Sequence, residues 1–318
     1  MSHFSVHDPI QGRHDLVEKY KKKLASMPPQ TGLDYILEGN PDSPTNPSRA
    51  VLNELIKLPE YADTYKSYPN DLVKVKQKQD NIQFAGMVES VDQSLGTLVA
   101  KLKELGLEDN TIIFFMSDNG GMSVMNGTPR REVPKEILDT RTSTSNLPLR
   151  GAKGWLYEGG IRVPMIVKWP QKGKKGTVCD EPLISVDFYP TILEMVSAEG
   201  QIKAIDGKSF TRLVRGKKME RGPIYWHFPQ YSNHGMQSPG GAIRDGDYKL
   251  LEYFENGTVQ LFNLKDDIGE QNDLSKAQAH KAKELTAKLH QWRKDVDAQM
   301  MTPNPEYDPA LDPWSGKK

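Results

Sequence analysis

The spacing of apolar positions in the first part of the chain predicts helices and buried strands in alternation. An apolar face with helical spacing predicts a helix over residues 14–26. Residues 71–105 carry the strongest helical pattern, and Gly106 is a plausible end for it. The apolar run 111–116 follows at once and predicts a buried strand. A helix followed by a strand in this way is typical of layered α/β folds.

Weaker patterns complete this part of the chain. Residues 1–7 alternate as a strand does, residues 161–169 predict a second apolar strand, and residues 187–196 predict a short helix. Residues 27–47 are dense in proline, asparagine and glycine and predict a long surface loop. Residues 122–148 are polar and irregular, so we expect a long irregular connection between the two apolar strands.

From about residue 206 onward the pattern changes to short strands. Turn residues such as those at 245–247 separate these strands, as they do in β-hairpins. The predicted strands cover residues 224–228, 242–244, 248–254 and 259–263, and a helix over residues 276–299 follows them. We therefore expect two parts: an α/β part over residues 1–205, and a smaller antiparallel sheet with one C-terminal helix over residues 206–318.

Composition and charge exclude several classes of protein. The 318 residues include 42 lysines and arginines and 42 aspartates and glutamates, so no overall charge favours nucleic acid or a membrane surface. No apolar stretch approaches the roughly 18 residues that a transmembrane helix needs, and the first residues show no secretory leader pattern. Cys179 is the only cysteine, which excludes an internal disulfide, and we expect it to pack as a partly buried apolar residue.

Two segments carry candidate chemistry. Asp118 and Asn119 follow the predicted strand 111–116, and ligands gather beyond the carboxyl ends of strands in open α/β sheets. Their oxygens suit Ca²⁺ or Mg²⁺, although Asp-Asn-Gly is more often an ordinary turn. Lys153 lies in a glycine-rich segment suited to an oxyanion, although a single lysine is more often solvated. Together the two segments predict a metal site that processes an anion.

The same two segments resemble the type I sulfatases, a family within the alkaline phosphatase superfamily. The matching residues are Ser-Asp-Asn-Gly-Gly over 117–121 and Leu-Arg-Gly-Ala-Lys-Gly-Trp-Leu-Tyr-Glu-Gly-Gly-Ile-Arg-Val-Pro over 149–164. Further similar segments are residues 185–193, 206–209, 246–250 and 261–264. The resemblance implies the family's fold: a mostly parallel layered sheet flanked by helices, and a small antiparallel subdomain with one C-terminal helix.

The resemblance also implies roles for individual residues. Asp118 and Asn119 would be two of the ligands of a bound Ca²⁺, and Lys153 would hold a sulfate oxygen and stabilise the departing alkoxide. His7 matches the family histidine that contacts the sulfate or its bridging oxygen, and the ordinary pKa of histidine, about 6.5, suits proton donation near neutrality. Candidates for the rim of the substrate site are Trp226, His227, Tyr231 and Arg244.

Several family features are missing from the sequence. The family's nucleophile is a formylglycine made from the first residue of a Cys/Ser-x-Pro-x-Arg segment. Neither this segment, nor two aspartate ligands, nor the family's Gly-Lys-x-x-His segment precedes His7. Residues 45–49 mimic the signature, but the threonine that stands first there would give a ketone rather than an aldehyde.

The absence of these family features leads to three expectations for this chain. It should correspond to the C-terminal two-thirds of a sulfatase and be inactive alone. It should also hold Ca²⁺ weakly, since Ca²⁺ takes six to eight oxygens. Sheet edges left uncovered would favour self-association.

The leading hypothesis is that the complete form hydrolyses a sulfate ester, on a sulfated glycan or another sulfated small molecule. The alternative is a non-catalytic remnant that binds an anion or a partner. Phosphoryl transfer is disfavoured, because Lys153 lies in the sulfatase segment and no run of histidine and aspartate ligands for two zinc ions is present. The sequence names neither the substrate nor the compartment, although complete family members are commonly periplasmic or secreted.

Overall fold

The computed structural model describes residues 1–42, 48–58, 64–65, 72–124, 133–134, 142–201, 205–232 and 237–308, with the backbone alone at 64–65 and 133–134. The α-helices are α1 (His14–Ser26), α2 (Arg49–Leu55), α4 (Ile82–Glu104), α6 (Glu158–Ile161), α7 (Phe188–Met195), α8 (Thr211–Val214) and α9 (Ala279–Asp295). Short 3-10 helices cover Glu108–Asn110, Ser185–Asp187 and Glu199–Gln201. The strands are β1 (Tyr35–Glu38), β2 (Thr64–Tyr65), β3 (Val73–Lys76), β4 (Ile113–Met116), β5 (Val133–Pro134), β6 (Met165–Lys168), β7 (Ile224–Phe228), β8 (Gly240–Asp245), β9 (Tyr248–Tyr253) and β10 (Val259–Asn263).

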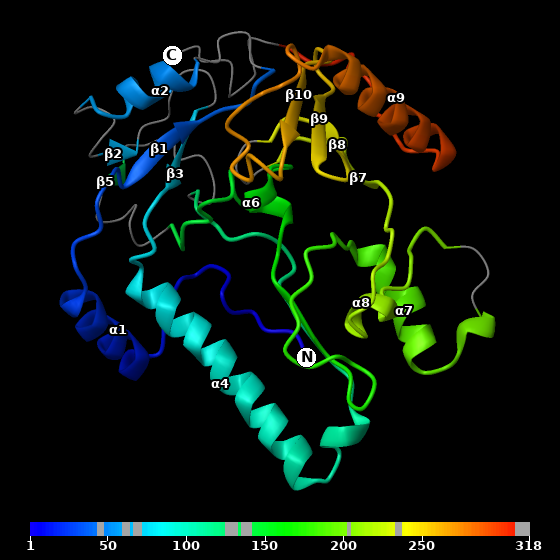
Figure 1. The fold of residues 1–318 in the computed structure, drawn as a ribbon. Helices are drawn as coiled ribbons and strands as arrows, with labels where there is room; N and C mark the ends of the chain where they lie inside the picture. The colour runs from blue at the N-terminus through cyan, green and yellow to red at the C-terminus, as the bar shows by residue number, and fades with distance from the viewer. Residues whose placement is uncertain are drawn as a thin grey trace.

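Strands β7 to β10 form an antiparallel sheet in the order β10-β9-β8-β7, with α9 beside it (Figure 1). Successive side chains of a strand point to opposite faces of the sheet. Ile243 of β8 belongs to an apolar cluster with Leu289 of α9, whereas its neighbour Ala242 belongs to a cluster with residues 152–157. The helix therefore covers one face of this sheet, and the segment before α6 covers the other.

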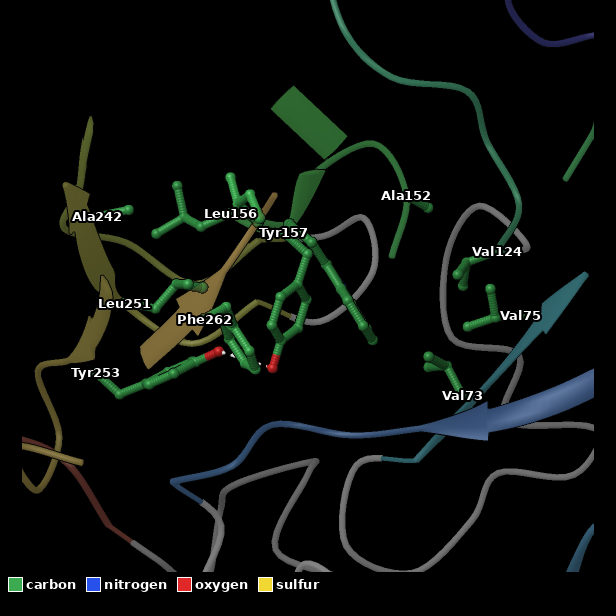
Figure 2. Packing of buried hydrophobic residues seen from close by; sticks show 12 residues of the cluster. Val73, Val75, Val124, Ala152, Leu156, Tyr157, Ala242, Leu251, Tyr253 and Phe262 are labelled. Atoms are coloured by element: carbon green, nitrogen blue, oxygen red, sulfur yellow. Dashed lines mark hydrogen bonds between the residues drawn. The ribbon is translucent and has the colours of Figure 1, made fainter. Parts of the chain in front are cut away.

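The central apolar cluster joins the two parts of the chain. Figure 2 shows Tyr157, from the segment before α6, near Phe262 of β10, and the two ring centroids lie 6.4 Å apart. The hydroxyl of Tyr253 donates to the hydroxyl of Tyr157 at 3.3 Å (Figure 2). Val75 of β3 belongs to the same cluster. The sheet β7–β10 thus holds the segment before α6 in place, and the boundary between residues 205 and 206 stays a prediction.

β4 and β6 pair in antiparallel orientation, with Phe114 opposite Val167. The N–H of Gly120 donates to the carbonyl of Gly160 at 2.9 Å, so the long connection leaves and returns at the same end of the pair, and β6 must run back along β4. Every strand pairing within the described ranges is antiparallel, which corrects the expected mostly parallel sheet for this part of the fold. The mixture of helices and strands, and the small antiparallel sheet with its C-terminal helix, are confirmed.

The predicted helix over residues 71–105 is wrong at its start. Valine and lysine alternate in β3, and this period of two suits a strand. Asn81 then caps α4, and its side chain accepts hydrogen bonds from two backbone N–H groups of the first turn at 3.0 and 3.1 Å. β3 pairs with β1, which lies within the segment 27–47 that we expected to be a loop throughout. The strand expected over residues 1–7 is also wrong, since residues 1–4 have no regular structure and a turn and a bend cover residues 5–7.

Most other predictions about elements agree with the structure. α1, β7 and β10 have the bounds that the sequence predicts, and α7 and α9 are shorter than predicted. Cys179 is exposed rather than partly buried. Residues 45–47, which begin the signature mimic, lie outside the described residues. No helix within the described ranges combines the length and the apolar character that crossing a membrane requires.

Candidate functional site

Residues 117–121, here called the Asp118 loop, follow β4 and are held by backbone contacts. Besides the bond from Gly120 to α6, a Cβ atom on Gly120 would lie 1.8 Å from the carbonyl oxygen of Gly159, so glycine alone fits there. Oδ1 of Asp118 accepts from the N–H of Asn119 at 2.9 Å, and Nδ2 of Asn119 donates to the carbonyl of Gly120 at 2.9 Å. Both candidate ligands are therefore fixed at the carboxyl end of β4.

Residues 150–159, here called the Lys153 loop, lie directly beside the Asp118 loop. The N–H of the last residue donates to the carbonyl of the first at 2.7 Å, which closes the Lys153 loop. The N–H of Lys153 donates to the carbonyl of Gly121 at 3.2 Å. Nδ2 of Asn146 donates to the carbonyls of Gly121 and Gly151 at 2.8 and 3.1 Å. The structure thus brings together the two segments that carry the predicted chemistry.

His7 reaches the Lys153 side chain from a segment 146 positions away. Nζ of Lys153 lies 2.8 Å from Nε2 of His7, and both residues are half-buried. A lysine ammonium has three donors and no acceptor, so Nε2 accepts this hydrogen bond and the ring proton lies on Nδ1. Nδ1 in turn lies 3.2 Å from the carbonyl of Asp8, which accepts that proton. The site therefore places a cation next to a neutral imidazole.

A buried ion-pair network anchors the start of the Lys153 loop. Nε and Nη2 of Arg150 donate to the two carboxylate oxygens of Glu38 at 3.0 and 2.8 Å, and Arg49 donates to the same carboxylate at 2.5 Å. Burial would raise the pKa of Glu38, but the two guanidinium groups hold that pKa below its ordinary value. The guanidinium of Arg150 lies 4.1 Å from the ring centre of Tyr157, and burial raises the pKa of Tyr157 to about 12.

Asp118 and Asn119 fit calcium by the kind of ligand that they offer. Within the described residues, no donor contacts Oδ2 of Asp118 or Oδ1 of Asn119, so two hard oxygens are available for a cation. The same part of the chain contains no group of three or more histidine, cysteine, aspartate or glutamate side chains that could hold a metal ion. The pair therefore suits Ca²⁺ but covers only part of the six to eight oxygens that Ca²⁺ takes.

The rim candidates lie on or near β7 and β8. Trp226 packs against the central apolar cluster, and His227 bonds through Nε2 to a backbone carbonyl 2.7 Å away. Arg244 lies 3.8 Å from the carboxylate of Glu158 in α6, and Tyr231 donates a hydrogen bond to a glutamate. Among the described contacts, none joins these four side chains to His7 or Lys153. Their role at a substrate rim stays a prediction.

Sequence reasoning missed three residues that hold the site together. Glu38 lies in a segment predicted to be a loop, although an acid at the end of the apolar run Tyr-Ile-Leu could have indicated a buried charge. Asn146 joins the two loops through backbone carbonyls, a role that no sequence signal marks. Glu270, which accepts from the N–H of Glu158 at 2.7 Å, lies just after a segment noted only for its similarity to a subdomain strand.

Two family profiles match the chain. The profile described as Sulfatase matches residues 53–198. The profile described as N-sulphoglucosamine sulphohydrolase, C-terminal, matches residues 152–299. The Lys153 loop lies almost entirely within both ranges.

Individual relatives give the same family. A sulfatase of Formosa agariphila is 30% identical over 233 residues, which cover 66% of this chain and 39% of the relative. Steryl-sulfatase of Mus musculus is 38% identical over 184 residues, which cover 57% of this chain and 28% of the relative. Among solved structures, Ps i-CgsB in complex with k-i-k-neocarrahexaose is similar with a TM-score of 0.54 and 30% identity, covering 69% of this chain and 44% of that chain.

The chain spans about half or less of the length of these relatives. The two profile matches, the relatives and the contact between the Asp118 loop and the Lys153 loop agree with one another. The chain belongs to the type I sulfatase family.

Proposed function

We propose that the complete protein hydrolyses sulfate esters, and that this chain carries the part of the site that binds the sulfate group. The observation that supports this most directly is the 2.8 Å contact between Lys153 and His7, beside the Asp118 loop. The cation and the neutral imidazole are in contact, and the loop that carries the two hard oxygen ligands lies beside the loop that carries the lysine. This set suits a tetrahedral anion whose charge is shared with a divalent cation.

In this proposal the chain's own residues bind and orient the sulfate group. The ammonium of Lys153 donates to a sulfate oxygen and offsets the negative charge that grows as the ester bond breaks. Once a sulfate oxygen takes the place of His7 as the acceptor for Lys153, Nε2 of His7 can take up a proton and give it to the departing alkoxide. Ca²⁺ held by Asp118 and Asn119 would polarise the sulfate oxygens as a Lewis acid.

We infer that the isolated chain does not turn over sulfate esters. The sequence contains no Cys/Ser-x-Pro-x-Arg segment from which a formylglycine could be made. A non-catalytic remnant that binds an anion is the second candidate, favoured by the small number of metal ligands among the described residues. Coding sequence upstream that contains this segment in frame would favour the enzyme, and a stop codon there would favour the remnant.

A sulfated sugar is the substrate class that we propose. Ps i-CgsB, whose complex holds k-i-k-neocarrahexaose, is similar to this chain over 69% of its length. Steryl-sulfatase has higher identity but is similar over 57% of the chain, which makes a sterol sulfate the competing class. Parallel titrations of the chain with a sulfated carrageenan oligosaccharide and with a steryl sulfate distinguish the two. Tighter binding of the steryl sulfate would overturn the choice.

We also propose that copies of the chain associate through the β4–β6 pair. Ile166 of β6 is 63% exposed and Met116 of β4 is 43% exposed. Apolar side chains on a short, open strand pair favour contact between copies.

Titration with sodium sulfate, followed by NMR of the histidine and lysine side chains, tests the sulfate site. We expect saturable binding that weakens about tenfold in Lys153→Ala, because a hydrogen bond to a charged group contributes roughly 1.5–3 kcal/mol. Lys175→Ala removes an exposed lysine outside the site and should leave binding unchanged. Equal sulfate binding by Lys153→Ala and the wild-type chain would contradict the proposal.

An aryl sulfate assay tests the inferred inactivity. The isolated chain should release no phenol above the buffer rate, whether or not Ca²⁺ is added. Turnover by the isolated chain that disappears in Lys153→Ala would show that it carries its own nucleophile. The inference of inactivity would then be wrong.

A further inference from the structure

Glu270 contacts both ends of the Lys153 loop. Its side-chain Oε2 accepts from the N–H of Glu158 at 2.7 Å, and its backbone carbonyl accepts from Nη1 of Arg150 at 2.8 Å. Arg150 is the first residue of the loop, and Glu158 directly precedes the last. A residue from the second part of the chain therefore fastens the two sides of the loop that carries Lys153.

The surroundings of Glu270 are buried and charged. Glu270 and Lys249 of β9 are both 0% exposed. Nζ of Lys249 lies 2.9 Å from Oε1 of Glu270, in a direction that makes an ion pair without a hydrogen bond, and it donates to Oε1 of Glu158 at 3.0 Å. Buried ion pairs of this kind often stabilise a fold no better than apolar residues of similar volume do. Fold stability alone therefore does not explain why Glu270 contacts the Lys153 loop.

The backbone conformation of Glu270 also indicates a role for its side chain. Its φ is +51°, in the left-handed region that favours glycine. A glycine would adopt this conformation without strain, so the turn by itself does not require a glutamate. What requires the glutamate is its carboxylate, which reaches the N–H of Glu158.

We propose that Glu270 is a positioning residue for Lys153. By holding Glu158 and Arg150 it fixes the base of the Lys153 loop. The loop in turn bonds to the Asp118 loop through the N–H of Lys153, and Gly160, directly after the loop, accepts from the N–H of Gly120. The ammonium of Lys153 is thereby kept beside His7. This inference rests on the proposed sulfate site and adds to it the residue that sets its geometry.

Hydrogen–deuterium exchange of the full chain tests the proposal, with three variants. Glu270→Gly removes the carboxylate and relieves the backbone strain. Glu270→Gln keeps an oxygen acceptor for the N–H of Glu158 but removes the charge. Asp273→Ala is the matched control, because Asp273 accepts from the N–H groups of Leu261 and Ser275 at 3.0 and 2.8 Å in the same part of the chain, and neither of these bonds involves the Lys153 loop.

We expect exchange over residues 117–121 and 150–161 to rise about tenfold in Glu270→Gly, with α9 unchanged, since a lost hydrogen bond to a carboxylate opens only the segment that it holds. Glu270→Gln should show a smaller rise in the same segments, and Asp273→Ala none there. If Glu270→Gly does not fold, the exchange measured for Glu270→Gln decides whether Glu270 positions the Lys153 loop. Unchanged exchange in the two loops, or an equal rise in α9, would overturn the proposal.

Sulfate titration supplies the second readout. Glu270→Gly should bind sulfate about tenfold more weakly, and Glu270→Gln should recover part of that loss, because its amide oxygen still accepts from Glu158. Asp273→Ala should bind as the wild-type chain does. If the wild-type chain binds no sulfate, the proposed function fails, while the exchange data still decide the role of Glu270.

Discussion

Glu38 is a buried carboxylate that two arginines share, and its side chain should be costly to change. It is 2% exposed and bonds to Arg150 and Arg49. Glu38→Gln should lower the free energy of unfolding by about 3–5 kcal/mol, because it leaves buried positive charge without its partner. Glu104→Gln breaks an exposed pair with Lys101 and should lower it by about 1 kcal/mol or less. Urea unfolding followed by tryptophan fluorescence measures both.

The same substitution should change how stability depends on pH. The pKa of Glu38 in the folded protein lies below its ordinary value of 4.5, so its stabilisation is present above that pH and is lost as the pH falls through the lowered pKa. Glu38→Gln has no such group to protonate, so its free energy of unfolding should fall less steeply below pH 4.5 than that of the wild-type protein. Burial raises the pKa of Glu270, so protonation of Glu270 has the opposite effect on stability, and it does so equally in the wild-type protein and in Glu38→Gln. If the free energy of unfolding fell equally steeply with pH in Glu38→Gln and in the wild-type protein, Glu38 would not be the group responsible for the pH dependence.

At the residue scale, the sequence predicts the candidate chemistry of the site but not the contacts that hold the site together. Asp118 and Lys153 are candidates because each lies in a distinctive local segment, and the structure joins their loops. His7 is a candidate through family resemblance, and it contacts Lys153. Glu38 was missed because its partner Arg150 is 112 positions away, and only the fold shows that pairing.

At the scale of elements, local patterns predicted the bounds of helices and strands well where the pattern fitted only one type of element. α1 has the predicted bounds because its apolar face keeps helical spacing throughout, and β10 has them because a turn precedes it. The segment that became β3 was misread because its valines fit both a helical stripe and a strand. Its pairing with β1, Tyr35 opposite Lys76, settles the matter, and such a distant partner is not visible in a local pattern.

Gly120 lies where the Asp118 loop meets α6, and it should tolerate no side chain. Its Cβ atom would meet the carbonyl oxygen of Gly159 at 1.8 Å, and backbone atoms cannot move aside cheaply. Gly120→Ala should therefore lower the free energy of unfolding by about 1–3 kcal/mol, as overpacking does. It should also weaken sulfate binding, since the loop would have to shift. Urea unfolding and the sulfate titration measure the two effects.

Gly96 provides the control for this substitution. It lies in α4 and is exposed, and a Cβ atom there would meet nothing within 4 Å. Gly96→Ala should raise stability by up to about 1 kcal/mol, because alanine is the better helix former. If the two alanine variants changed stability alike, close packing of the Asp118 loop against α6 would not explain the effect at Gly120.

At the scale of the whole molecule, the sheet β7–β10 and the pair β4–β6 differ in how well other parts of the chain cover them. Both faces of β7–β10 pack against other parts of the chain. Around β4 and β6, in contrast, apolar side chains remain exposed, among them Ile166 at 63% and Met116 at 43%. The chain has no net charge, so electrostatic repulsion between copies is weak. These features together favour association through the β4–β6 pair.

Sedimentation velocity tests this association directly. The wild-type chain should show species larger than a monomer whose share grows with concentration. Ile166→Lys should shift the chain toward monomer, because a lysine on an open strand opposes contact between sheets. Val178→Lys makes the same change in a loop, at a residue that is 91% exposed, and should leave association unchanged. A wild-type chain that stays monomeric, or equal behaviour of the two variants, would exclude this surface as the contact. Because β4 leads directly into the Asp118 loop, contact there would lie close to the proposed sulfate site, so monomeric Ile166→Lys should bind sulfate at least as tightly as the wild-type chain.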